Sequence, residues 1–350
     1  MSAPTNPSVL IIGGSGVVGS RAARALRRLQ PALPITLGAR DLARADTLAK
    51  EIGGANAARI DLERQDLGLP ADAAFSAVVV FLKDTSLNSM KYAQAKGIPY
   101  VAFSDFVFDI GPAVAHYIQK PGSAPILMLG HFLGGTVTLA ALHFAREFQH
   151  VHSIEIGAVF DEEDVGGPAA KGDLEHVARS VPHPLILENG KFLWAQGEGA
   201  TRVFRGADGT EWKGHASPLL DVVSLAAATD ARTVRLDFAV RPSASRRPGQ
   251  GLSHEVIIEI VGERRDGTTG RVRHALTDDD VHSGMSARGA ALAVERLLGL
   301  AGGPPVAPGL YHPEGLLDPA YVLERLKELG TRIQVTALPE RHGRLQQRMT

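Results

Sequence analysis

A run of closely spaced glycines follows the first apolar stretch of the chain, Val9–Ile12. A turn of this kind lets backbone N–H groups approach a pyrophosphate, and the helix that it opens directs its N-terminal dipole at the anion. The run satisfies both GxGxxG and GxxGxxG, and it stands between an apolar strand and a helical pattern, as the motif requires. We therefore expect a bound dinucleotide rather than a turn that serves only helix packing. The expected contacts are Gly13, Gly14, Ser15, Gly16, Val17, Val18 and Gly19.

Arg40 ends the second apolar stretch, Ile35–Ala39. An acidic residue here would accept hydrogen bonds from the ribose 2′-OH of NAD, whereas an arginine can hold the 2′-phosphate of NADP. Arg44, about one helical turn further on, would support it. The sequence thus favours NADP, with NAD as the alternative if Asp41 binds the ribose instead of capping a helix. Further cofactor contacts are expected at strand ends, at Asp61, Leu62, Phe81 and Leu82.

Candidates for proton transfer also follow strands, because ligands of open parallel sheets bind beyond the carboxyl ends of the strands. Lys83 would act as an acid or pair with a substrate carboxylate, and Asp84 would orient it. His131 has a pKa suited to transfer near neutrality, and His282 is the second choice. For each of them a purely structural role is the alternative.

Two more residues are expected to face the substrate. Asp105 would bind a substrate ammonium or cap the next segment, and Phe132 follows His131 at the crossing out of the first sheet. The aspartates in Asp278–Asp280 are expected to form a solvated face and an N-cap, and the absence of HExxH and CxxC patterns predicts no metal. Tyr92 and Lys96 match the Tyr-x-x-x-Lys pattern of short-chain dehydrogenases, which we interpret as a chance match within a helix.

The elements that must position these residues change in kind near residue 130. Before it, short apolar runs alternate with helical patterns, which predicts parallel strands at Val9–Ile12, Ile35–Ala39, Ala57–Asp61, Ala77–Leu82, Pro99–Ala102 and Ile126–Leu129. After it, a helix over Gly135–Phe148 precedes longer strands at Ser153–Phe160, Thr233–Val240, Glu255–Gly262 and Gly270–Leu276. The loops GADGT and RRDGTTG indicate a largely antiparallel sheet, and helices are expected at Ser217–Ala228, Ala287–Leu300 and Pro319–Leu329.

The predicted architecture is α/β. A Rossmann domain over residues 1–130 holds a doubly wound parallel sheet, an α+β domain over 131–283 serves substrate binding and dimerisation, and C-terminal helices over 284–350 return to the Rossmann domain. Two segments are expected to be mobile loops, the acidic Asp161–Asp173 and the basic Arg241–Gly251.

Composition narrows the classes of protein. In 350 residues, 37 Lys and Arg nearly balance 38 Asp and Glu, so no overall field draws nucleic acid or an anionic membrane. The lack of cysteine excludes disulfides and thiolate chemistry within this sequence. No segment approaches the length of an apolar membrane span, and no basic region precedes an apolar one at the start. We expect a cytoplasmic protein.

Several stretches resemble the saccharopine dehydrogenase-like oxidoreductases. They are VLIIGGSGVVG with ITLGARD, AQAKGIPYVAFSD, the crossing Gly130–Gly135, VHSGMSARGAALAVERLLGL and VAPGLYHPEGLLDPAYVLERLKELG. The resemblance implies a Rossmann domain, an inserted α/β domain over its carboxyl edge, and NAD(P)-linked chemistry at a carbon–nitrogen bond of an amino acid or amine. His131 and Leu133-Gly134 depart from the family's Gly-aromatic-Pro-Gly, and Ser283-Gly284 stands where Thr-Gly is common, so substrate identity is not carried over.

These observations predict an NADP-dependent oxidoreductase, dimeric, that transfers a hydride between nicotinamide and a C=N or C=O centre of a small polar substrate. One alternative is a carbonyl or alcohol oxidoreductase for an uncharged substrate. Another is a non-catalytic NADP-binding regulatory protein that keeps the fold without an acid–base group in the cleft.

Overall fold

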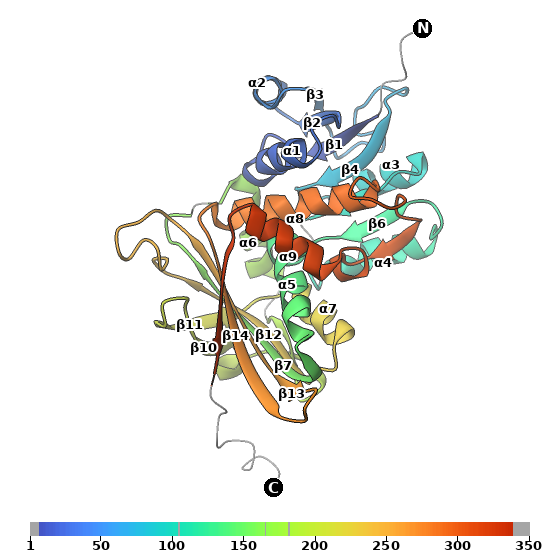
Figure 1. Ribbon diagram of the computed structural model, residues 1–350. Coiled ribbons are helices and arrows are strands. Elements are labelled where there is room, and N and C mark those ends of the chain that lie inside the picture. Colours follow the sequence, from blue (N-terminus) through green and yellow to red (C-terminus); the bar gives the residue numbers. More distant parts are fainter. Residues whose placement is uncertain (1–6, 104–105, 165, 181–182, 339–350) are drawn as a thin grey trace.

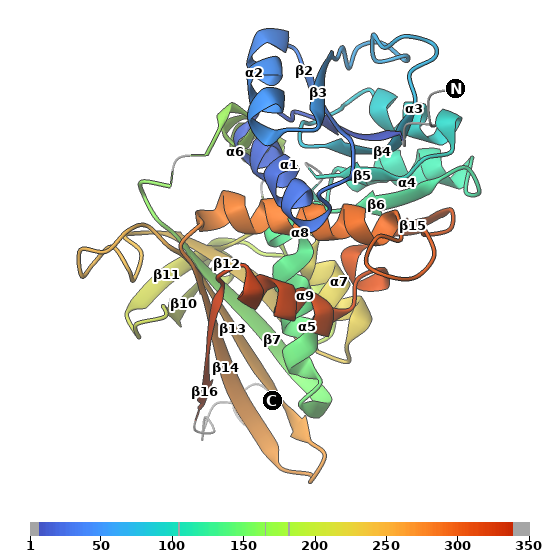
Figure 2. The ribbon, with the colours of Figure 1, turned by 45° about the horizontal axis from the view of Figure 1, so that its top comes forward.

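The computed structural model describes residues 7–103, 106–164, 166–180 and 183–338, which form two sheets with helix α8 (Val281–Leu297) between them (Figures 1 and 2). Within these residues, sheet A has seven strands in the order β15-β6-β5-β4-β1-β2-β3. Every pairing in it is parallel. The strands are β1 (Ser8–Ile12), β2 (Ile35–Ala39), β3 (Ala55–Arg59), β4 (Phe75–Val80), β5 (Tyr100–Ala102), β6 (Pro125–Met128) and β15 (Gly309–Tyr311).

Alternate side chains of sheet A enter two cores on its opposite faces. On one face, Val9 and Ile11 pack with α1 (Val17–Leu29), α2 (Leu42–Ile52) and α8. On the other, Leu10 and Ile12 pack with α3 (Asn88–Lys96) and α4 (Ile110–Ile118). A parallel sheet covered on both faces needs this continuous apolar pattern, which explains why the first strands read clearly in the sequence.

Sheet B is mixed and largely antiparallel. Its main path is β10-β11-β12-β7-β13-β14-β16, β8 and β9 form a hairpin beside β12, and the pairing of β12 with β7 is parallel. The strands are β7 (Phe148–Phe160), β8 (Leu185–Glu188), β9 (Lys191–Trp194), β10 (Thr201–Arg205), β11 (Glu211–Ala216), β12 (Thr233–Val240), β13 (His254–Arg264), β14 (Thr269–Asp278) and β16 (Arg332–Ala337).

Helices α5 (Thr136–Ala145) and α7 (Asp221–Ala228) pack on sheet B through a shared apolar core. Helix α9 (Pro319–Glu328) lies against α5, and α6 (Pro168–Ser180) lies near α1 in both views (Figures 1 and 2). Short 3-10 turns are η1 (Phe132–Gly135), η2 (Gly197–Ala200) and η3 (Pro313–Gly315). No helix in the described ranges has both the length and the apolar character needed to cross a bilayer.

The predicted fold class is confirmed: a Rossmann-like parallel sheet is joined to a second, largely antiparallel sheet, and α8 returns to pack against α1. The loops GADGT and RRDGTTG join β10 to β11 and β13 to β14, as predicted. The segment after α8 also supplies a strand to each sheet, β15 to sheet A and β16 to sheet B.

Some predicted boundaries are wrong. The helix expected to reach Phe148 ends at Ala145, and Phe148 already begins β7, because its ring enters the sheet B core. Strands β3 and β4 end two residues earlier than predicted, since the apolar residues Phe81 and Leu82 continue into the loop after β4. The acidic segment expected to be a mobile loop is helical from Pro168 onward. Its first residues are tied to the basic segment, because Arg246 forms ion pairs with Asp161, Glu162 and Glu163.

Candidate functional site

The glycine turn lies at the carboxyl end of β1, next to the centre of sheet A, and opens α1. Gly13 has a φ of +79°, and a Cβ on Gly19 would lie 2.3 Å from the Gly13 carbonyl oxygen. The turn therefore excludes side chains where the chain doubles back. No acidic residue stands in the first turn of α1, so the free N–H groups and dipole of that helix are available to an anion.

Other elements surround this turn. The Leu82 side chain packs on Gly13, whose added Cβ would come within 3.1 Å of the Leu82 Cγ, and Phe81 packs on Phe103 with ring centroids 4.9 Å apart. From sheet B, the segment before α6 reaches the start of α1, since a Cβ on Gly167 would lie 2.9 Å from Val17. The predicted contacts in residues 13–19 and 81–82 are thus brought together.

Arg40 and Arg44 are both exposed at the carboxyl end of β2. Neither forms an ion pair with any residue that the structure describes. Asp41 is the N-cap of α2, where its side chain accepts a hydrogen bond of 3.2 Å from the Arg44 backbone N–H. This position leaves two guanidinium groups facing solvent beside a carboxylate that is already used as a cap.

Asp61 and Leu62 form the turn after β3, where Asp61 accepts a hydrogen bond from the Glu63 backbone and is exposed. The Leu62 carbonyl accepts hydrogen bonds from Ser86 and from the Asn88 side chain, 2.8 Å away, which joins this turn to the segment after β4.

The pair Lys83 and Asp84 separates in the structure. Asp84 is buried and accepts hydrogen bonds from the backbone and hydroxyl groups of both Ser86 and Ser89, which makes it a local cap before α3. Lys83 instead forms an ion pair of 2.8 Å with Asp109, and the His176 Nε2 on α6 lies 3.1 Å from the same carboxylate. Asp109, rather than the predicted Asp84, therefore positions Lys83.

His131 lies at the carboxyl end of β6 and is almost fully buried. Its Nε2 lies 2.7 Å from the Ser224 hydroxyl on α7, and that hydroxyl lies 3.0 Å from the Nδ1 of His312, which follows β15. Burial first, and then the nearby His312, lower the pKa of His131 to about 3. The ring is therefore neutral at physiological pH, which makes it a weak proton donor.

Phe132 and His282 belong to a ring cluster between the two sheets. Phe132 packs on Phe238 at 4.7 Å, and Phe160 packs on both His254 and His282. The His282 Nδ1 lies 2.5 Å from Asp164 Oδ2. Although burial alone would raise the pKa of Asp164, hydrogen bonding from His282 holds it below its usual value. Phe132 is itself buried, and the rings that it contacts belong to this core.

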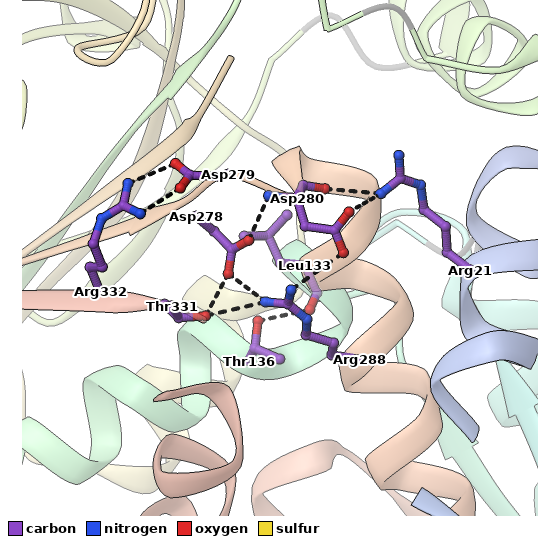
Figure 3. Close-up of polar contacts among 9 residues, drawn as sticks. All are labelled: Arg21, Leu133, Thr136, Asp278, Asp279, Asp280, Arg288, Thr331 and Arg332. Atoms are coloured by element: carbon purple, nitrogen blue, oxygen red, sulfur yellow. Dashed lines mark hydrogen bonds and ion pairs between the residues drawn. The ribbon is translucent and has the colours of Figure 1, made fainter. Parts of the chain in front are cut away.

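The three aspartates before His282 hold arginines (Figure 3). Asp278 accepts from Arg288 and from Thr331, 2.6 Å away, while Asp279 pairs with Arg332. Asp280 pairs with Arg21 on α1 and with Arg288. The expected solvated face is correct for Asp279 and Asp280, but Asp278 is buried, because it forms a network that joins β14, α8 and the start of β16.

Asp105 lies outside the described residues. Sequence reasoning missed Asp109, Asp164, Ser224, His312 and Glu314, all of which contact a predicted residue or lie beside one. The signal for His312 was present in the sequence, because its HPEG motif follows a short apolar run that becomes β15. Tyr92 and Lys96 lie on α3, where the Lys96 ammonium sits over the Tyr92 ring.

Comparison with known proteins shows the fold. No family model matches the sequence, and no curated protein matches it. Apo saccharopine dehydrogenase (L-Glu forming) from Saccharomyces cerevisiae is similar in structure, with a TM-score of 0.62, 16% identity, and coverage of 95% of this chain and 100% of that one. A myo-inositol dehydrogenase from Corynebacterium glutamicum is less similar in structure, with a TM-score of 0.46, 15% identity, and coverage of 96% of this chain and 99% of that one. The resemblance seen in the sequence is therefore confirmed at the level of the fold: this chain has the fold of saccharopine dehydrogenase.

Proposed function

We propose that the protein is an NADP-dependent oxidoreductase that transfers a hydride between nicotinamide and a C=N or C=O centre of a small polar, amino-acid-like or amine-like substrate. The observation that carries the proposal is the glycine turn at the end of β1, where side chains are excluded and a helix N-terminus faces outward. The similar yeast enzyme bears the name of a dehydrogenase that forms L-Glu, in line with chemistry at a carbon–nitrogen bond.

The choice of NADP rests on the two exposed arginines after β2. Arg40 and Arg44 offer their guanidinium groups to a 2′-phosphate, while Asp41 is engaged as the cap of α2. For proton transfer we favour Lys83, which follows the strand next to β1 and is held by Asp109, over the buried His131. His282, held by Asp164, is the second candidate. We also propose that the protein acts as a cytoplasmic homodimer that binds neither nucleic acid nor membranes.

Cofactor choice is tested by titrating NADPH and NADH, followed by nicotinamide fluorescence. We expect Arg40→Ala to weaken the binding of NADPH by about 10-fold or more, because a charge-assisted pair with the phosphate is lost. The affinity for NADH should change by no more than about 2-fold. Arg28→Ala, an exposed arginine in the last turn of α1, is the control and should change neither affinity. Equal losses for both cofactors in Arg40→Ala would contradict the 2′-phosphate assignment.

Activity is tested by NADPH consumption with keto acids plus amines, with preformed imines, and with aldehydes. Turnover with the first two classes supports the proposal, and turnover with uncharged aldehydes alone would favour a carbonyl reductase. Lys83→Met should lower kcat by about 100-fold or more while NADPH affinity stays unchanged. Tight NADPH binding without turnover across the panel would favour a regulatory protein.

A further inference from the structure

We propose that His131, His312 and Glu314 form a binding site for a divalent transition-metal ion of the zinc type. Together with Ser224, these residues are called the His–Glu cluster below. They come from three places: the end of β6, helix α7, and the segment that runs from β15 into η3. The proposal is independent of the proposed function, because it concerns the carboxyl ends of β6 and β15 rather than the glycine turn.

The donor atoms already converge. One ligand atom from each of His131, His312 and Glu314 lies within 4.8 Å of the other two. The His131 Nε2 and the His312 Nδ1 lie 2.7 and 3.0 Å from one point, the Ser224 hydroxyl oxygen, so both imidazoles present a nitrogen to the same small volume. The Glu314 Oε1 lies 3.6 Å from the same His312 nitrogen.

Little movement is needed to complete the site. Zinc bonds of about 2.0–2.1 Å place tetrahedral ligands roughly 3.3 Å apart, so the donors must approach one another by about 1.5 Å at most. The side chains of His312 and Glu314 are 28% and 16% exposed and follow a strand of three residues, which leaves them free to make that adjustment. His131 is fixed by burial and would serve as the rigid ligand.

The charge of the cluster favours a cation. The Glu314 carboxylate lies against the His312 imidazole, with its Oε1 atom on the side of the cluster. Its Oε2 atom is buried and has no hydrogen-bond partner among the described residues. The imidazole of His131 can offer a ring-nitrogen lone pair to a metal ion.

A second buried carboxylate strengthens this argument. Asp221 is fully buried and precedes Ser224 by about one turn of α7. In the described part of the chain, no Lys or Arg lies within ion-pair distance of Asp221 or Glu314. A divalent ion would neutralise the carboxylates that the protein leaves without a cationic partner.

The donor set points to zinc rather than magnesium or calcium. Two imidazoles with one carboxylate are the ligands that zinc and similar transition metals prefer, whereas magnesium and calcium take oxygen ligands. The Ser224 hydroxyl can supply a fourth donor or hold a ligand in place. The sequence predicts no metal because the three ligands lie at positions 131, 312 and 314, too far apart to form a spaced motif.

The experiment uses the full chain, freed of metal with EDTA and then dialysed. Zn²⁺ is titrated against a chromophoric chelator, Co²⁺ is added separately to record the absorption of tetrahedral cobalt, and thermal unfolding is followed with and without Zn²⁺. We expect one Zn²⁺ per chain with a Kd below about 1 µM. Saturating Zn²⁺ should raise the Tm by about 3 °C, because the ion binds the folded state alone.

Two ligand variants and one control make the test specific. His312→Ala and Glu314→Gln should each weaken Zn²⁺ binding by about 10–100-fold and remove the Tm shift, while an unchanged Tm in the absence of Zn²⁺ shows that the fold is kept. His150→Ala removes a histidine that is paired with Asp230 on the exposed surface, and it should bind Zn²⁺ as the unchanged protein does. A Kd for Zn²⁺ above about 10 µM in the wild-type chain would overturn the proposal. So would a Glu314→Gln variant that binds Zn²⁺ as tightly as the wild-type chain.

Discussion

Two regions at the same edge of sheet A offer polar groups in opposite ways. At the end of β1 and β2, the glycine turn presents backbone N–H groups, and the side chains of Arg40 and Arg44 face solvent. At the end of β6 and β15, the His–Glu cluster presents side chains that are wholly or mostly buried, and α7 covers it. The first arrangement suits a large ligand that comes and goes, because its groups stay hydrated without it. The second requires partners that are always present, since buried polar groups are costly when unpaired.

The strongest test of this difference is a single methyl group in the turn. Gly19→Ala places a Cβ within 2.3 Å of the Gly13 carbonyl oxygen. The turn must therefore open, and its N–H groups no longer point toward the bound pyrophosphate. We expect dinucleotide affinity to fall by about 100-fold or more, measured by fluorescence titration. Gly122→Ala, where nothing lies within 4 Å of the added atom, is the matched control. A Gly19→Ala variant that binds NADPH normally would disprove the assigned role of the turn.

Removal of one carboxylate beside each region should lower the free energy of unfolding by different amounts. Asp221→Ala leaves the Phe132 N–H and the Thr138 hydroxyl without their buried acceptor, and we expect a loss of about 3 kcal/mol in the free energy of unfolding. Asp41→Ala removes only the cap of α2, which costs about 1 kcal/mol. Urea unfolding of both variants measures the difference, and similar losses would contradict the contrast between buried and solvated groups.

Acid should act through the buried ring cluster between the sheets. Burial first, and then the nearby His282, lower the pKa of His254 from 6.5 to about 3 in the folded chain. Between pH 6.5 and 3 the unfolded state binds a proton at His254 that the folded state does not bind. The free energy of unfolding is therefore highest above pH 6.5 and falls as the pH drops toward 3, by at most about 1.4 kcal/mol per pH unit.

His254→Leu removes this proton-binding difference. Unfolding free energies measured between pH 7 and 5 should therefore decline less steeply in the variant, by about 2 kcal/mol over that interval. Because both ring nitrogens of His254 lack hydrogen-bond partners among the described residues, the substitution leaves no donor stranded. An unchanged slope would show that the acid sensitivity arises elsewhere.

The smallest effect is expected where the acidic and basic segments meet. Arg246 is partly exposed and lies between Asp161 and the two glutamates that follow it. Arg246→Ala should cost less than about 1 kcal/mol, since both glutamates are exposed to water and Asp161 keeps its hydrogen bonds from the Glu163 and Ser243 backbone. A salt titration of the unfolding free energy measures this contribution, which should disappear at about 1 M salt. A loss of several kcal/mol would contradict this small, screened contribution.

Sequence reasoning succeeded where structure is local. The strands of residues 8–12 and 35–39, the turn between β1 and α1, and Arg40 lie within about thirty residues, and each carries its own pattern of apolar and small residues. It failed where a short strand takes its identity from a distant neighbour, as β15 does on β6 and β16 does on β14. Partner choice failed for the same reason, because Asp109, and not the adjacent Asp84, lies against Lys83.

The close backbone approach between α8 and η1 has a consequence for the order of assembly. Gly289 on α8 sits against the Gly134 carbonyl oxygen, where a Cβ would lie 2.3 Å away, so α8 docks on a turn formed some 150 residues earlier. Strand β6 likewise stays a bare edge until β15 is made. On the ribosome, the parallel sheet therefore waits with part of one core face uncovered while strands β7 to β14 are synthesised. We infer that the first 130 residues expressed alone would expose this face and aggregate, so a cofactor-binding fragment has to include the C-terminal segment.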